Sequence, residues 1–408
     1  MIDLHGGGGH HVAYSRAVLC EAKRRKWQVV SAMTAEAQRH SSYSGIRHIL
    51  EDGNQLVTVS GVKRRFHSKP LRWIDGQFAV FSAIRGAFNR ACRLGRPDAA
   101  FIVDCDSWYP IAALLGSPTP TVPFVTIALR ARYHHRQLGI RATDLSPAAA
   151  HLQRTVFKRF LRGRDLACVL TPDETLVDSC EPRSPGRLRY LPDLAELPKL
   201  VDQQEARSAL GLPDGARVIL SYGSLSRRKG ISELLNVLSD KRCPPDVVAL
   251  IAGEADSETT AVLHSEVAER LRKRGRFHWI GGFLDVGDTA TKLAFSSAEV
   301  AWLGYRDFYT SSAFLWQASL AGLPIIGCRD GLIGDLVDRH ELGLTVNPND
   351  SSEVLWAFDA LTKNQDTRSS IAENCRREGA KHVSSRFGGT ICDALASCSP
   401  EVGVGLSS

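Results

Sequence analysis

Short apolar segments rich in β-branched residues alternate with amphipathic segments along the whole chain. The apolar segments of the first half are WQVVSA, AAFIVD, VPFVTIAL, LACVLT and RLRYLP, and those of the second half are ARVILSYG, DVVALIAG, FHWIGG, AEVAWLG, LPIIGC and LGLTVN. Strands of this kind, separated by helices, are typical of parallel βαβ units whose sheets are buried on both faces. The pattern predicts an α/β protein.

The alternation is interrupted between Leu191 and Gly215, where prolines flank a short helical segment. Each half then opens with a strand and a glycine-bearing turn into a helix. We expect two Rossmann-like doubly wound domains that face each other across a cleft, with ligand at the carboxyl ends of the strands. The expected division is residues 1–195, residues 196–365, C-terminal helices in 366–396 that could pack back on the first domain, and a disordered tail in 397–408.

The composition is that of an ordinary globular protein, with 43% hydrophobic and 23% charged residues among 408. The ten cysteines occur singly, without a C-x-x-C pair, so neither a zinc site nor a disulfide framework is indicated. The chain opens without the pattern of a signal peptide, which predicts a cytoplasmic protein. Prolines interrupt the long uncharged run from Ser107 to Leu129, so we expect helix, turn and buried strand there rather than a membrane span.

Charge is distributed unevenly about a net value of +7. Residues 1–195 carry 28 lysines and arginines against 16 acids, whereas residues 196–408 carry 23 against 28. This excess of positive charge in the first half predicts attraction to an anionic surface, including peripheral attachment at the inner face of a membrane. Solvated helix faces with local ion pairs are the alternative. No aromatic-interleaved basic motif accompanies the charge, so nucleic acid is not expected. The basic clusters are Lys23–Lys26, Lys63–Arg65, Arg85–Arg96, Arg130–Arg141 and Arg154–Arg164.

A run of four glycines, Gly6 to Gly9, leads into a helix expected from about His11 to Lys26. Consecutive glycines let backbone amides approach a ligand, and a helix N-terminus favours phosphate. Gly7, Gly8 and Gly9 are therefore candidate ligand-binding residues, with a structural tight turn as the alternative. The run is not G-x-G-x-x-G and no Walker lysine follows it, so dinucleotide and P-loop sites are not indicated.

The segment SYGSLSRRKGISELL, Ser221 to Leu235, gathers Arg227, Arg228 and Lys229 just before a helix that begins near Gly230. Cations at a helix start oppose the local dipole, so their position indicates a bound anion, and a diphosphate fits. A solvated basic surface is the alternative.

The segment TSSAFLWQASLAGLP, Thr310 to Pro324, predicts a helix from about Ser312 to Ala321 that presents free amides at its start. It contains no carboxylate. A competing motif, DCD at Asp104 to Asp106, has the spacing of some divalent-metal sites, but it ends a strand in the basic half, far from the phosphate-binding segments. No metal and no cofactor is expected.

The order of the segments GSLSRRKG, VVALIAGEA, FHWIGGF, SSAEVAWLGYRD, QASLAGLPIIG, DGLIGDLV and ELGLTVNPNDSSEV, within residues 215–365, resembles a known family. It is similar to retaining glycosyltransferases of the GT-B architecture, in particular the family 4 group (glycosyl transferases group 1), which use nucleoside-diphosphate sugars. Residues 1–200 resemble this family more diffusely, through the glycine loop, LACVLTPDETLVDSC and RLRYLPD. The resemblance implies that the N-terminal domain supplies the acceptor side and the C-terminal domain the donor side.

The resemblance implies that Lys229 and Arg228 bind the donor diphosphate, with Arg227 beside them. The further arginine expected after the first glycine of the motif is Ser224 here.

The paired glutamates of the family fall on Tyr309 and Gln317. An amide at 317 can still bind ribose hydroxyls, though without charge assistance. Asp307 is a candidate to compensate for the missing acid beside the sugar. Ser311 and Ser312 occupy the loop whose amides would face the phosphates.

A histidine after a central strand often serves the acceptor side in such enzymes, and His134 is the candidate here, with Arg130 and His135 nearby. The function expected is a hexosyltransferase that moves a sugar from a nucleoside-diphosphate donor to a glycan, lipid-linked or other hydroxyl acceptor, with retention and without a metal. A non-catalytic relative that acts as a binding or partner subunit is the alternative. An epimerase or phosphorylase would need further acids or a cofactor-binding lysine that the sequence does not identify.

Overall fold

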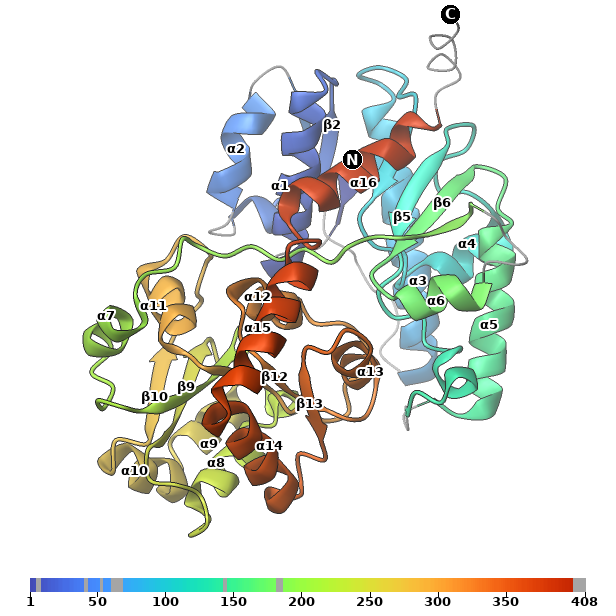
Figure 1. Ribbon diagram of the computed structural model, residues 1–408. Coiled ribbons are helices and arrows are strands. Elements are labelled where there is room, and N and C mark those ends of the chain that lie inside the picture. The colour runs from blue at the N-terminus through green and yellow to red at the C-terminus, as the bar shows by residue number, and fades with distance from the viewer. Residues whose placement is uncertain are drawn as a thin grey trace, which may run out of the picture. The chain divides into compact units, whose positions relative to one another are not determined.

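A computed structural model describes residues 1–4, 9–39, 43–51, 54–59, 69–141, 145–180 and 186–398. The chain divides into two compact units. The first comprises Met1–His134, Leu145–Leu194 and the segment from Ser384, and the second comprises the segment from His135 and Ala195–Val383. Each unit holds one parallel sheet covered by helices on both faces (Figure 1), which confirms the predicted α/β fold with two doubly wound sheets.

The sheet of the first unit has the strand order β3-β2-β1-β4-β5-β6-β7. Its strands are β1 (Ile2–Asp3), β2 (Val30–Thr34), β3 (Gln55–Val59), β4 (Ala100–Ile102), β5 (Phe124–Ile127), β6 (Leu166–Thr171) and β7 (Leu188–Tyr190). Its helices are α1 (Gly9–Arg24), α2 (Ser44–Glu51), α3 (Lys69–Ala91), α4 (Tyr109–Leu115), α5 (Pro147–Leu161), α6 (Glu174–Cys180) and α16 (Ser384–Ala396).

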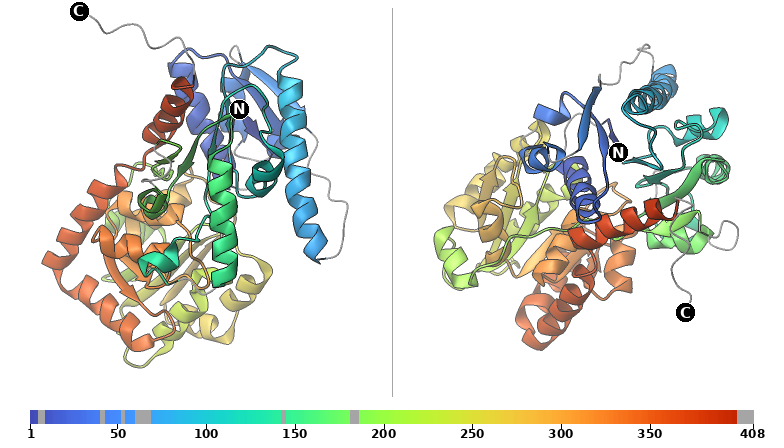
Figure 2. Two further views of the ribbon diagram at one scale, coloured as in Figure 1. Left: turned by 90° about the vertical axis from the view of Figure 1, so that its right-hand side faces the viewer. Right: turned by 90° about the horizontal axis from the view of Figure 1, so that it is seen from above.

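Alternate residues of each central strand of this sheet point to opposite cores. In β4, Ala100 and Ile102 pack with α3, α4 and α5, whereas Phe101 packs with α1 and α16. Figure 2 shows the two helical layers on either face of the sheet. The uncharged run from Ser107 forms α4, a turn and β5, as predicted. The strand patterns did not include β3, a five-residue edge strand whose first four residues are not buried.

The sheet of the second unit has the strand order β10-β9-β8-β11-β12-β13. Its strands are β8 (Arg217–Tyr222), β9 (Val247–Gly253), β10 (Phe277–Gly281), β11 (Val300–Leu303), β12 (Ile325–Cys328) and β13 (Gly343–Val346). Its helices are α7 (Gln203–Ala209), α8 (Ile231–Ser239), α9 (Ser257–Leu263), α10 (Glu266–Lys273), α11 (Thr289–Ser297), α12 (Ala313–Ala321), α13 (Leu332–Arg339), α14 (Ser351–Lys363) and α15 (Gln365–Gly379).

The C-terminal helices divide between the two units. α15 packs on α12 within the second unit, and α16 packs on α1 within the first. Every cysteine whose side chain is described is free. Among the described residues, no helix combines the length and the apolar character needed to cross a bilayer. The predicted tail lies outside the described residues from position 399 on.

Candidate functional site

Four helices of the second unit begin without a side-chain cap. One is α11, which follows the edge strand β10. The other three are α8, α12 and α13, whose N-cap residues Gly230, Ser312 and Gly331 make no side-chain cap hydrogen bond. They follow β8, β11 and β12, which are neighbours in the sheet. Uncapped helix starts leave backbone N–H groups that need a partner, and anions are well suited to them. By contrast, α7, α9, α10, α14 and α15 are capped by Asp202, Asp256, Ser265, Asp350 and Asn364.

Helices α8, α12 and α13 begin at or next to the position where the strand order of the sheet reverses. The strand order runs outward from β8 to β10 on one side and from β11 to β13 on the other. In open α/β sheets, a reversal of this kind leaves a crevice at the carboxyl ends of the strands, where ligands bind. The edge formed by the ends of β8, β11 and β12 is therefore the candidate site.

Gly230 brings the end of η5 (Arg227–Lys229) against the end of β11. Its φ is 66°, in the left-handed region, and a Cβ built there would lie 2.0 Å from the carbonyl oxygen of Gly304. Only glycine tolerates both the conformation and the approach. The basic turn is thereby held beside the β11–α12 loop.

Lys229 is a buried cation, with 5% of the residue exposed. Its Nζ donates to the carbonyl oxygen of Tyr222 at 2.9 Å and to the hydroxyl of Tyr305 at 2.5 Å. It also lies 4.7 Å from the ring centroid of Tyr305 and 5.2 Å from that of Phe314. In the part of the chain that the structure describes, none of these partners is a carboxylate. An ammonium group has three donors, so one remains for a ligand, and a buried charge with neutral neighbours favours an anion.

Tyr305 connects the basic turn with the start of α12. Its hydroxyl receives the hydrogen bond from Lys229 and lies 2.8 Å from Oγ of Ser312. Tyr305 is buried and was not identified from the sequence, because an aromatic residue just after a strand carries no spacing signal. The structure thus brings together Lys229 and Ser312, two of the residues predicted to bind the donor.

Arg228 lies over the ring of Phe308, with its guanidinium carbon 4.8 Å from the ring centroid. The backbone of the same residue is also held, since its carbonyl accepts from the N–H of Arg306 at 2.7 Å. Arg306 in turn pairs with Glu233 on α8 at 2.5 Å. These contacts place the exposed Arg228 beside the β11–α12 loop, on the same side as Lys229. Phe308, Arg306 and Glu233 were not predicted from the sequence.

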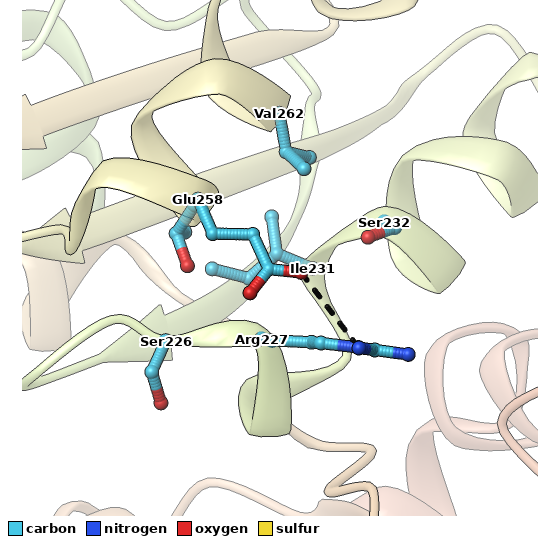
Figure 3. A pocket seen from close by; sticks show the side chains of 7 residues that line it. Ser226, Arg227, Ile231, Ser232, Glu258 and Val262 are labelled. Atoms are coloured by element: carbon cyan, nitrogen blue, oxygen red, sulfur yellow. Dashed lines mark ion pairs between the residues drawn. The ribbon is translucent and has the colours of Figure 1, made fainter.

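Arg227 lies apart from its two basic neighbours. It forms an exposed ion pair with Glu258 of α9 at 3.8 Å (Figure 3), over a shallow pocket between the starts of α8 and α9. The pocket is lined by Ser226, Arg227, Ile231, Ser232, Glu258, Thr259 and Val262. Of the three basic residues in the turn, only Arg228 and Lys229 contact the β11–α12 loop.

The other predicted residues of the β11–α12 region have different degrees of exposure. Asp307 is exposed, with a positive φ of 49°. Tyr309 is buried, and its Cα lies 3.0 Å from the position of a Cβ built on Gly331, at the start of α13. Ser311 is half-buried, and Gln317 donates from Nε2 to the carbonyl of Glu196 at 3.2 Å. Ser224 is exposed in the turn after β8.

The predicted residues of the first unit include His134, which is completely buried. Its Nε2 lies 3.0 Å from Oδ2 of Asp173 and 3.0 Å from the hydroxyl of Thr175. A role at an acceptor hydroxyl would require these contacts to open. Gly9 is the first residue of α1, whereas Gly7 and Gly8 lie outside the described residues.

The DCD motif holds a loop of the first unit. The carboxylate of Asp106 accepts from the backbone N–H groups of Leu129 at 2.8 Å and Arg130 at 3.1 Å. Burial, together with the neighbouring charge of Asp104, raises the pKa of Asp106 well above its ordinary value. The side chain of Asp106 therefore holds the backbone of the loop after β5, and Asp104 accepts from the N–H of Asp106 within the motif.

Comparison with known proteins points to one family. Residues 202–378 match the family described as Glycosyl transferases group 1. A lipopolysaccharide core biosynthesis mannosyltransferase, LpsB of Rhizobium meliloti, is 26% identical over 166 residues, which are 39% of this chain and 45% of that protein. An uncharacterized glycosyltransferase of Methanocaldococcus jannaschii is 24% identical over 174 residues, 42% of each protein. Each alignment thus covers less than half of the relative.

Solved structures share the fold along the whole chain. Sucrose-phosphate synthase from Thermosynechococcus elongatus has a TM-score of 0.68 at 16% identity, covering 97% of both chains. HepE of Anabaena, solved in complex with UDP and glucose, has a TM-score of 0.64 at 16% identity, covering 97% of this chain and 98% of that one. At these identities the likeness concerns the fold, which is that of GT-B glycosyltransferases. The matched residues 202–378, which contain the candidate site, form a glycosyl transferases group 1 domain.

Proposed function

We propose that the protein is a hexosyltransferase that moves a sugar from a nucleoside-diphosphate donor to an acceptor hydroxyl. The observation that carries this proposal is the buried ammonium of Lys229, which has only neutral described partners and lies at the edge where three uncapped helices begin. A diphosphate supplies the missing negative charge and accepts hydrogen bonds from the free amides. The structure of HepE with UDP and glucose supports this class of ligand.

The proposed chemistry depends on charge that develops on the leaving diphosphate as the glycosidic bond breaks. Lys229, Arg228 and the amide groups at the starts of α8 and α12 would stabilise that charge without a metal ion. Retention of the anomeric configuration is proposed from the resemblance to the family 4 group. Gly9 with its neighbouring glycines and the exposed Ser224 are proposed as further contacts to the donor.

The rest of the donor would contact the β11–α12 loop and α12. We assign the ribose hydroxyls to Gln317, whose Nε2 donates to Glu196, so its carbonyl oxygen would accept from the ribose. Asp307, exposed on the loop, is the proposed polar group beside the sugar, with Tyr309 and Ser311 lining the same segment.

The acceptor is proposed to be a glycan or a lipid-linked hydroxyl on the cytoplasmic side of a membrane. The mannosyltransferase of lipopolysaccharide core biosynthesis supports a glycolipid acceptor, and the excess of basic residues in 1–195 supports peripheral attachment to an anionic surface. His134 is proposed to act on the acceptor side by holding Asp173 and Thr175 in place.

The test is the Lys229→Met variant, which keeps the apolar stem of the side chain and removes its charge. We expect donor hydrolysis and transfer to fall roughly a hundred- to thousandfold, as when one preorganised charge-stabilising donor is removed. Lys273→Met, on the exposed last turn of α10, is the matched control and should keep full turnover. Thermal unfolding of both variants checks that the fold survives.

Two results would contradict the proposal. Unchanged turnover in a folded Lys229→Met protein would remove Lys229 from the site. A wild-type protein that binds nucleotide sugars but neither transfers nor hydrolyses them would instead be a non-catalytic relative of the family.

A further inference from the structure

Large apolar side chains are exposed on one helical layer of the first unit and not on the other. The layer of α3, α4 and α5, with the turn after α3, exposes Ile74, Phe78, Leu94, Leu114, Leu115 and Leu152, each by 45% to 68%. Among the described residues of α1, α2 and α16, on the opposite face of the same sheet, no large apolar side chain is exposed. Single exposed apolar residues are normal, but a concentration on one layer marks an interaction surface.

The three helices form one continuous face. α4 packs against both α3 and α5, and Figure 2 shows the three helices side by side on one face of the sheet. The guanidinium of Arg159 on α5 donates to the carbonyl of Ala113, next to the exposed leucines at the end of α4. On α3, the spacing of Ile74, Phe78 and Arg85 places all three on one side of the helix. We call this surface the outer face of α3–α5.

The outer face of α3–α5 is basic, and four of its described arginines form no ion pair. Arg85, Arg93 and Arg162 are exposed and Arg154 is half-buried, and none of them has an ion-pair partner in the described ranges of the chain. The acids within these three helices and in the turns that follow them are Asp75, Asp98 and Asp165.

On the opposite layer, Arg386 of α16 is also exposed without an ion-pair partner among the described residues, but two arginines of α1 and its C-terminal turn are paired. There, Arg24 pairs with Glu21 at 2.6 Å, and Arg25 pairs with Glu21 at 2.7 Å and with Asp393 of α16 at 2.6 Å. What distinguishes the outer face is that its unpaired arginines lie beside exposed large apolar side chains, which the described residues of α1, α2 and α16 do not provide.

We propose that the outer face of α3–α5 docks on an anionic phospholipid bilayer. The apolar side chains would enter the boundary between headgroups and acyl chains, and the arginines would contact lipid phosphates. With this face on the bilayer, the sheet of the first unit lies along the membrane, so its carboxyl edge stays close to the lipid surface. The inference rests on the proposed membrane-side acceptor, to which it assigns a docking surface.

The test is sedimentation of the full chain with vesicles of phosphatidylcholine, with and without about 30% phosphatidylglycerol, at low and physiological salt. We expect binding to the anionic vesicles that weakens with salt, and little binding to phosphatidylcholine alone. Each arginine near an anionic surface strengthens binding roughly fivefold. The Arg85→Gln/Arg93→Gln double variant should therefore bind roughly 25-fold more weakly, and Leu114→Ser/Leu115→Ser roughly tenfold more weakly with its salt dependence retained.

Matched controls lie outside the face. Trp356→Ser removes an apolar side chain of α14 that is 60% exposed, and Lys241→Gln/Lys273→Gln removes two exposed charges of the second unit. Both controls should bind vesicles like the wild type. Because all substituted side chains are exposed, thermal unfolding should be unchanged in every variant.

Several outcomes would overturn the proposal. These are wild-type binding that does not depend on anionic lipid, face variants that bind like the controls, or controls that lose as much binding as the face variants. Failure to bind vesicles combined with tight binding to RNA would assign the basic face to nucleic acid instead. Hydrolysis of the donor in solution, measured on the same variants, is a separate readout. If the wild-type protein does not hydrolyse any donor, the proposed activity is contradicted, while the result of the vesicle experiment still holds.

Discussion

Lys229 is the residue on which the proposed donor site depends most. Its ammonium group is buried beside a backbone carbonyl, a tyrosine hydroxyl and two aromatic rings. Removing a cation from water is costly unless an opposite charge or several hydrogen bonds compensate for it. Hydrogen bonds to Tyr222 and Tyr305 compensate in part, and a diphosphate would complete the compensation. The arrangement holds the charge in place before the ligand arrives.

The Tyr305→Phe variant tests whether this positioning matters. It keeps the ring over the ammonium group and removes the hydroxyl that contacts Lys229 and Ser312. We expect KM for the donor to rise roughly tenfold, which corresponds to about 1.5 kcal/mol, the lower end of the range for one hydrogen bond to a charged group, with a smaller change in kcat. Tyr109→Phe removes a buried phenol hydroxyl from the first unit and serves as the control. An equal effect of both substitutions on KM would contradict a positioning role for Tyr305.

Uncapped helix starts are concentrated at the candidate edge of the second unit. Helices α7, α9, α10, α14 and α15 have side-chain caps, whereas α8, α12 and α13 at this edge and α11 after β10 have none. A missing cap costs stability, typically about 1 kcal/mol, because backbone N–H groups remain unsatisfied. Three such starts on adjacent strands are consistent with a site in which the ligand provides the missing acceptors.

In the first unit, the contact between α1 and α16 combines apolar packing with a charged link, and the charged link predicts a pH effect. Hydrogen bonds from Arg24 and Arg25 lower the pKa of Glu21 from 4.5 to about 2, and Arg25 also pairs with Asp393 of α16. Because the folded state favours the carboxylate, this stabilisation is complete above pH 4.5 and is lost as the pH falls towards 2.

We therefore expect Glu21→Gln to lower the free energy of unfolding at neutral pH by about 1 kcal/mol, and the difference from wild type to disappear near the folded-state pKa. Urea unfolding of both proteins between neutral pH and pH 2 measures this difference in the free energy of unfolding. Glu373→Gln, at an exposed position of α15, is the control and should show no such pH-dependent difference. A Glu21→Gln deficit that persisted undiminished in acid would contradict the ionic origin of the effect.

At the scale of the whole molecule, the excess of positive charge and the candidate donor site lie in different parts of the chain. The excess of basic residues lies in residues 1–195, whereas the family match and the candidate site lie in residues 202–378. We expect the two parts to respond to different ligands: the first unit to an anionic surface and the second to a nucleotide sugar.

A thermal-shift panel of UDP-, GDP-, ADP- and dTDP-sugars tests the donor side of this division. A ligand present at about 100 times its Kd should stabilise the protein by about 2.7 kcal/mol, because it binds only the folded state. The base that gives the largest shift identifies the donor class. Lys229→Met should lose this shift, whereas a wild-type protein that responds to none of the four would contradict a donor site at this edge.

Much of the fold could be predicted from the sequence, because the patterns that indicate strands, helices and turns are local. Apolar, β-branched strands alternating with helices specify parallel sheets, and the motif from Ser221 to Leu235 placed a basic turn before a helix. It could not separate Arg227 from its neighbours: Arg227 pairs with Glu258, whereas Arg228 and Lys229 contact the β11–α12 loop. That difference depends on where the β11–α12 loop and α9 lie in space.

By itself, the sequence determined the fold class, the placement of positive charge and the segments that carry phosphate-binding chemistry. Periodicity, glycines and charge are properties of neighbouring residues, and they act within one strand or one turn. Only the tertiary structure decided that Lys229 is buried against Tyr305, that Arg228 rests on Phe308, and that the unpaired arginines share a face with exposed leucines. These contacts join residues far apart in the chain. Burial sets how strongly each charge interacts with its neighbours, and it arises only when the chain is packed.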